Sequence, residues 1–139
     1  MDNLDLSTID GLRILKVNNN ILHVHQIKPP YYFNLILGNI ACAQANTLSL
    51  GLMIKELPEN SIWSVGGVGN TQLPMNAMAI ITDGGVRVGL EDNIWYDNDR
   101  QKLATNYELI ERVVGIAKSL GHQPYRAEEV RELLNLIYV

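Results

Sequence analysis

The sequence has little of what marks a secreted, membrane-bound or nucleic-acid-binding protein. Its 139 residues include one cysteine, Cys42, which excludes a framework of intrachain disulfides and suits a reducing cytoplasm. No apolar run reaches the roughly 18 residues that a membrane-spanning helix needs, and residues 1–10 are acidic and lack the apolar core of a signal peptide. The net charge is −4 with no basic cluster, so we expect neither nucleic acid nor a membrane as a partner.

What the sequence does contain is typical of a soluble globular domain. Hydrophobic residues make up 47% of the chain and charged residues 19%, which are ordinary values for such proteins. A chain of 139 residues is sized for one domain with a moderate core. No linker or low-complexity segment divides it, so we expect residues 1–139 to form a single unit.

Apolar runs that predict strands alternate with segments of helical periodicity. This order predicts parallel strands joined by right-handed helical crossovers, the α/β class. Three such strands leave two unprotected sheet edges, and a complete (β/α)₈ barrel takes about 250 residues, so the chain supplies roughly half of one. We expect strands at 31–38, 61–65 and 84–93, and helices at 7–17, 47–57, 71–83, 105–120 and 127–136.

The segment 84–93 is an apolar run that carries an arginine in its middle and two adjacent carboxylates near its end. Read as a strand, it places Arg87, Gly89 and Glu91 on one face and the apolar residues between them on the other. Gly89 removes side-chain bulk between the guanidinium and the carboxylate, which leaves room for a ligand. A solvated hairpin edge would show the same residues, so the segment alone supports both interpretations.

Polar residues and glycines gather where the predicted strands end, and active sites of α/β folds lie at that edge. Asn34 lies near the end of the first strand, and the glycine-rich segment 66–70 precedes a helix, where an anion can bind. The segment lacks the Walker lysine and the full dinucleotide fingerprint, so a tight turn is the alternative. On the third strand, Glu91 suits zinc as an oxygen ligand, and Arg87 with Asp92 suits proton transfer.

Several stretches of the sequence resemble the β-keto acid cleavage enzymes, which include the 3-keto-5-aminohexanoate cleavage enzyme of lysine fermentation. Lys28–Gly38 is similar to the family's sixth strand region, and Ser61–Pro74 to its seventh strand and helix. Arg87–Asn93 is similar to its eighth-strand signature. Leu103–Asn106 and Ala127–Arg131 agree as well. The resemblance covers nearly the whole chain, in order and at the family's spacing.

The resemblance implies the C-terminal part of a zinc-dependent (β/α)₈ TIM barrel, comprising strands six to eight and the terminal helices. Such enzymes convert a β-keto acid and acetyl-CoA into acetoacetate and a new acyl-CoA. By resemblance, Glu91 matches the carboxylate zinc ligand, and Arg87 with Asp92 matches the pair that assists deprotonation and stabilises charge. Contacts to substrate or CoA are expected at the predicted strand ends, at Asn34, Ser64, Gly66, Gly67 and Gly69.

The histidines depart from the family pattern. The family's other zinc ligands form a His-x-His pair on a strand that this sequence does not contain, and His23-Val24-His25 imitates the pair at the opposite, non-catalytic end of the barrel. We therefore expect the chain to be inactive without an N-terminal half-barrel, supplied by another chain or by self-association into a homo-oligomer. The alternative is a non-catalytic truncated remnant that acts as an assembly or binding module. Tyr31, Tyr32 and Trp63 are expected to pack in the barrel.

Overall fold

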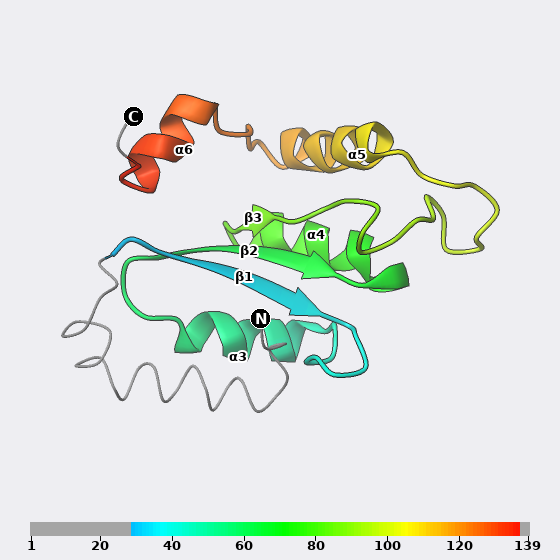
Figure 1. The fold of residues 1–139 in the computed structure, drawn as a ribbon, viewed down its shortest axis with the longest axis horizontal. Helices are drawn as coiled ribbons and strands as arrows, with labels where there is room; N and C mark the ends of the chain where they lie inside the picture. The colour runs from blue at the N-terminus through cyan, green and yellow to red at the C-terminus, as the bar shows by residue number, and fades with distance from the viewer. Residues whose placement is uncertain (1–28, 137–139) are drawn as a thin grey trace.

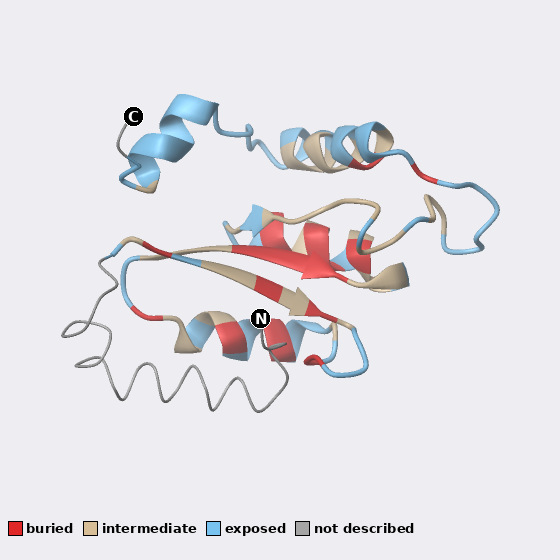
Figure 2. Ribbon diagram, in the orientation of Figure 1, coloured by how far each residue is buried: buried red, intermediate tan, exposed pale blue. Residues whose placement is uncertain are grey.

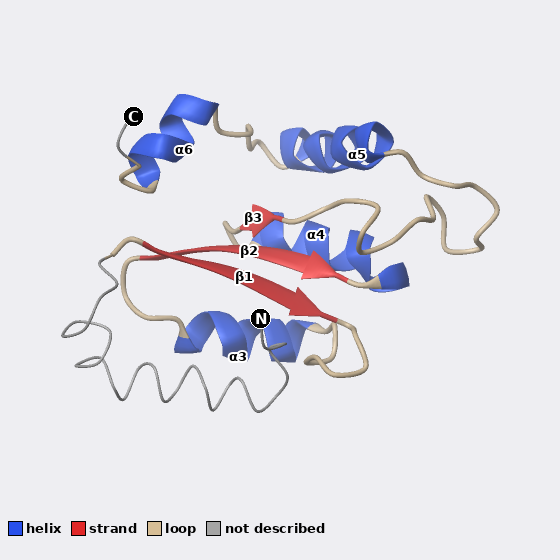
Figure 3. Cartoon of the chain, in the orientation of Figure 1, coloured by secondary structure: helices blue, strands red, loops and turns tan. Residues whose placement is uncertain are grey.

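The structure, a computed structural model, describes residues 29–136. The predicted helix at 7–17 and the histidine pair at 23–25 lie outside them. Helices follow strands along most of this part of the chain, as the α/β class requires (Figure 3). The elements are β1 (Tyr31–Leu37), α3 (Thr47–Glu56), β2 (Ser61–Gly67), the 3₁₀ turn η1 (Gly69–Thr71), α4 (Gln72–Ile81), β3 (Gly85–Val86), α5 (Asn106–Ser119) and α6 (Ala127–Leu133).

The strands form a parallel sheet in the order β1-β2-β3. β1 and β2 pair along their full length, from Tyr31 opposite Ser61 to Leu37 opposite Gly67, and their arrows point the same way in Figure 1. β3 pairs with β2 only through its two residues, opposite Ser64 and Val65. The predicted parallel α/β arrangement is confirmed. The closed barrel stays a prediction, because the described residues form an open three-stranded sheet.

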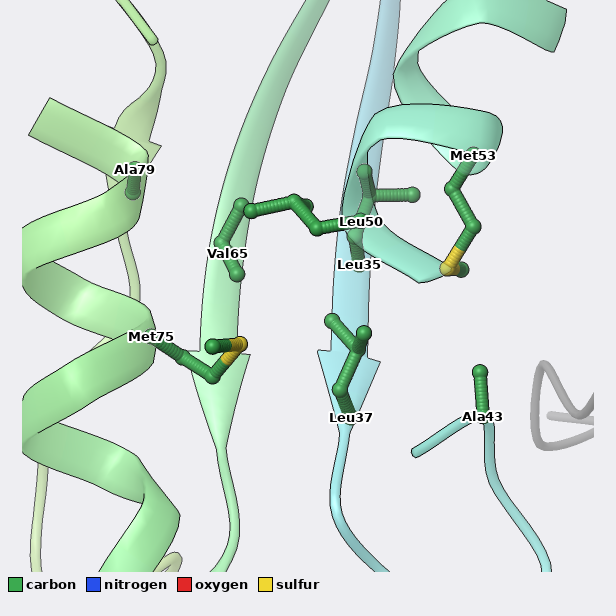
Figure 4. Packing of buried hydrophobic residues seen from close by; sticks show 8 residues of the cluster. All are labelled: Leu35, Leu37, Ala43, Leu50, Met53, Val65, Met75 and Ala79. Carbon is green, nitrogen blue, oxygen red and sulfur yellow. The ribbon is translucent and has the colours of Figure 1, made fainter. Parts of the chain in front are cut away.

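One face of the sheet is covered by α3 and α4. Alternate residues of the strands point toward these helices, and Figure 4 shows Leu35 of β1 and Val65 of β2 among the side chains of both helices. Residues of opposite parity on each strand point to the other face, which neither helix covers. The buried cluster consists of Leu35, Leu37, Ala43, Leu50, Met53, Val65, Met75 and Ala79.

The segment 84–93 is not the long strand that its apolar run predicted. Only Gly85 and Val86 join the ladder, and the chain then turns, with the Gly89 carbonyl accepting from Asp92 N at 3.2 Å and Asn93 N at 3.4 Å. Gly89, Asp92 and Asn93 are residue types that favour turns, and no further strand pairs with this segment among residues 29–136. The prediction that Glu91 shares a strand face with Arg87 is therefore wrong.

The turn in the glycine-rich segment 66–70 also begins later than predicted. Gly66 and Gly67 are the last two residues of β2, and the turn is confined to η1 and the residue before it. A Cβ on Gly67 would lie 2.4 Å from the carbonyl oxygen of Thr71, so the backbone approaches too closely for any other residue. Gly67 thus allows the turn to fold back onto the strand.

Helix α5 packs against α4, and α6 lies beyond the end of α5, away from the buried core (Figure 1). Helix α5 begins where the sequence predicted a helix, with a capping box: Thr105 Oγ1 accepts from Glu108 N, and the Glu108 side chain accepts from Thr105 N. Helix α6 is largely exposed, whereas α5 is partly buried and places Leu109 at 0% exposure (Figure 2). None of the helices from residue 29 to residue 136 is long and apolar enough to cross a membrane.

Candidate active site

The carboxyl ends of the strands are held together by backbone hydrogen bonds. Val68 N donates to the carbonyl of Leu37 at 3.0 Å, which joins the end of β2 to the end of β1. Gly69 N donates to the carbonyl of Asp92 at 2.8 Å, which joins the same turn to the segment that follows β3. The predicted site residues near these ends therefore share one edge of the sheet.

A polar row crosses the face of the sheet that α3 and α4 leave uncovered. Tyr32 Oη donates to Ser64 Oγ at 2.8 Å, and Ser64 Oγ donates to Asn34 Oδ1 at 3.2 Å. The structure thus brings the predicted residues Asn34 and Ser64 together, but in the middle of β1 and β2. The prediction that they lie at the strand ends is wrong, because both strands extend three residues beyond them. Tyr32 is 57% exposed in the described part of the chain, and its packing inside a closed barrel stays a prediction. Its place two residues before Asn34 on one strand is the sequence signal for a shared face.

Arg87 forms a bidentate ion pair with Asp92. Its Nε donates to Asp92 Oδ2 at 2.9 Å and its Nη2 to Oδ1 at 3.1 Å. The Asp92 side chain is only 7% exposed. Parallel bonds of this kind fix the plane of the guanidinium as well as its position. The hydrogen bonds to Asp92 raise the pKa of Arg87 above its ordinary value, so the group stays charged at any accessible pH.

Glu91 lies beside this pair and faces solvent. Its Oε2 is 3.2 Å from Arg87 Nη2, and its side chain is 85% exposed. The contact arises because the turn after Gly89 brings residues four apart together, rather than because the two share a strand face. The turn therefore assembles one cation and two carboxylates, with Asp92 held inside and Glu91 left accessible.

The glycines of this edge make room for protein groups. A Cβ on Gly66 would lie 3.2 Å from Arg87 Cδ, so the arginine stem lies directly over this residue. The amide of Val68 donates to the carbonyl of Leu37 in β1, and that of Gly69 to the carbonyl of Asp92 in the turn after β3. These contacts favour a tight turn over an anion cradle for the segment 66–70.

The described residues do not form a complete metal site by themselves. Between residues 29 and 136, no three His, Cys, Asp or Glu side chains lie close enough together to hold a metal ion. His122 lines a cleft with Ser61 and Gly84, at the amino ends of the strands, away from Glu91. Cys42 is buried in the loop between β1 and α3. Glu91 is thus not part of any group of three candidate metal ligands in this part of the chain.

Comparison with known proteins identifies the family of the chain. The family model of the beta-keto acid cleavage enzymes matches residues 12–136. This chain belongs to that family. It is 43% identical over 111 residues to the 3-keto-5-aminohexanoate cleavage enzyme of Fusobacterium nucleatum, a match covering 79% of this chain and 39% of the relative. The resemblance expected from the sequence segments is confirmed.

Other members of the family match the chain over a similar length. The 3-keto-5-aminohexanoate cleavage enzyme of Acetoanaerobium sticklandii is 38% identical, with 79% of this chain and 40% of that protein covered. The 3-dehydrocarnitine:acetyl-CoA trimethylamine transferase of Rhizobium meliloti is 33% identical, with 79% and 36% covered. The chain therefore spans about two fifths of the length of the curated relatives it matches.

Proposed function

We propose that the chain is the C-terminal part of a zinc-dependent enzyme that converts a β-keto acid and acetyl-CoA into acetoacetate and an acyl-CoA. The observation that carries this proposal is the Arg87–Asp92 ion pair beside the exposed Glu91, at the edge where the parallel strands end. The names of the relatives support the substrate class, since two are cleavage enzymes for a keto acid and a third names acetyl-CoA.

Arg87 is the proposed group for substrate charge. Asp92 engages its Nε and Nη2, and the guanidinium carries five N–H donors in a planar fork. The remaining donors can hold a keto-acid carboxylate or the negative charge that develops when a proton is removed next to a carbonyl. Asp92 orients the fork and is the proposed proton acceptor, with its low exposure protecting the charge pair from water.

Glu91 is the proposed zinc ligand of this chain. A carboxylate oxygen suits Zn²⁺, and catalytic zinc sites typically use three protein ligands with one open position. The single accessible carboxylate fits one of those positions, so the others must come from outside residues 29–136. When bound, the zinc would supply Lewis-acid polarisation of the β-keto carbonyl.

Two surfaces of the chain also support the proposal that a partner binds it. The edge of β3 that does not face β2 is unpaired within the described residues, and unpaired strand edges are sites of strand addition. Beside it lies a cleft of about 680 Å³ between the sheet, α5 and α6. Trp63, Val113 and Leu133 are among the apolar side chains that line it. We propose that an N-terminal half-barrel covers these surfaces.

A second candidate is a non-catalytic remnant that serves as an assembly or binding module. The observation that favours it is the lack of a complete set of metal ligands among residues 29–136. In that case the open sheet edge and the cleft would still bind a partner, but no zinc would be held at Glu91.

The two candidates differ in a complementation experiment. The chain is purified together with the N-terminal portion of the Fusobacterium nucleatum relative that precedes the matched region. Zinc content and acetoacetate formation from 3-keto-5-aminohexanoate and acetyl-CoA are then measured. We expect about one zinc per pair and turnover that neither piece shows alone. A stable pair that holds no zinc and makes no acetoacetate would establish the binding module instead.

A further inference from the structure

Two side-chain amides of α4 are buried beside the segment that carries the proposed catalytic residues. Gln72 is 0% exposed and Asn76 is 1% exposed. They lie on the same side of α4 as Met75 and Ala79, which belong to the apolar core. Amides seldom occupy such positions, because burial costs free energy unless each group is hydrogen-bonded. Their contacts therefore indicate a specific role.

Both amides donate to backbone carbonyls just beyond β3. Gln72 Nε2 donates to the carbonyl of Gly89 at 2.8 Å. Asn76 Nδ2 donates to the carbonyl of Arg87 at 2.8 Å and lies 3.4 Å from that of Val65. A carbonyl can only accept, so the nitrogen of each amide must face it. The two side chains thus replace strand pairing at the point where the ladder stops.

The held carbonyls belong to the turn that assembles the site. The Gly89 carbonyl accepts from Gln72 and also from Asp92 N at 3.2 Å, the contact that closes the turn. That turn brings Asp92 back to the Arg87 guanidinium and places Glu91 beside it. A shift of the Gly89 carbonyl would therefore move both carboxylates relative to Arg87.

We propose that Gln72 and Asn76 are positioning residues, which clamp the segment 87–89 so that Arg87, Glu91 and Asp92 keep their mutual geometry. Gln72 Oε1 is buried without a hydrogen-bond partner in the described part of the chain. A glutamine with half of its amide unpaired is a poor choice for stability alone. Its value lies in the bond that the nitrogen makes. The catalytic consequence rests on the proposed function, but the clamp itself does not.

The test uses Gln72→Met, which keeps the length of the side chain and removes the donor, and Asn76→Ala as a second variant. The matched control is Ala79→Gly, which weakens the same helix without touching the carbonyls of the segment 87–89. Each chain is studied in the assembly that it forms with the N-terminal portion of the Fusobacterium nucleatum relative. Amide exchange at Asp92 and Asn93, and the NMR signal of Arg87 Nε–H, are compared among the variants.

We expect exchange at Asp92 and Asn93 to become at least tenfold faster, and the Arg87 Nε–H signal to broaden or shift, in Gln72→Met and Asn76→Ala. The control should change neither. If turnover is present, kcat should fall at least tenfold while KM stays within about twofold. Unchanged exchange in both clamp variants would overturn the proposal, as would an equal effect of Ala79→Gly. An assembly without turnover would count against the proposed enzyme, while exchange and the Nε–H signal would still decide the clamp.

Discussion

The Arg87–Asp92 ion pair should behave as a strongly coupled pair in a double-mutant cycle. The variants are Arg87→Met, which keeps an apolar stem over Gly66, Asp92→Asn, and the two together. Hydrogen bonds to charged groups contribute about 1.5–3 kcal/mol, whereas exposed ion pairs contribute about 0.2–1 kcal/mol. Because Asp92 is 7% exposed and Arg87 is 28% exposed, we expect a coupling free energy of about 1.5 kcal/mol.

The two single variants should also differ in how much they lower the free energy of unfolding. Arg87→Met leaves a buried carboxylate without its partner, and an uncompensated buried charge is strongly destabilising. Asp92→Asn leaves a guanidinium that still reaches water, so its cost should be smaller. The assay is urea unfolding of the four proteins in the assembled state at one protein concentration, with and without added salt. A coupling free energy below about 0.5 kcal/mol, or an equal cost for both single variants, would refute the reasoning.

Three further predictions follow from the described contacts. Gly66→Ala should displace the Arg87 stem, because the new Cβ would lie 3.2 Å from Arg87 Cδ, and turnover of the assembled enzyme should fall. The control is Gly115→Ala, whose new Cβ meets nothing within 4 Å and which should not reduce turnover. The hydrogen bond and ion pair with Lys102 lower the pKa of Glu108 in the folded protein. The stability that this pair contributes is therefore present above the unfolded pKa of Glu108, about 4.3, and is lost as pH falls through the lower folded pKa. Thermal unfolding of wild type and Glu108→Gln should therefore diverge near neutral pH and converge in acid; parallel curves would contradict this. The isolated chain should sediment as an associated species, because an open sheet edge invites pairing; a compact monomer with cooperative unfolding would count against a partial barrel.

The sequence predicted the elements whose signals are local and strong. The apolar run at 31–38 located β1, and the helix predicted at 105–120 begins at its expected cap, Thr105. These features depend on neighbouring residues, so periodicity and capping chemistry suffice to find them. The polar contacts of Tyr32 and Asn34 on the opposite face of β1 were not predicted, because they depend on Ser64 of the neighbouring strand.

The end of β3 could not be predicted in the same way. An apolar run with an alternating pattern indicates a strand, but the length of a strand also depends on which backbone groups lie next to it. Here Gln72 and Asn76 of α4 donate to the backbone carbonyls of Gly89 and Arg87. The segment after Val86 is therefore held by a helix instead of by a neighbouring strand. A polar residue at a buried helix position was the available signal, since both amides fall at helical spacing with Met75. The sequence still placed Arg87 and Glu91 close together, but for a different geometric reason.

The most direct test of the central claim is the zinc content of the assembled enzyme in two carboxylate variants. Glu91→Gln keeps the shape of the side chain and removes its charge, so we expect zinc to be lost while the fold is retained. Asp92→Asn should keep zinc and lose turnover, since Asp92 is engaged with Arg87. Full zinc in Glu91→Gln, or loss of zinc only in Asp92→Asn, would contradict the assignment of Glu91 as the metal ligand.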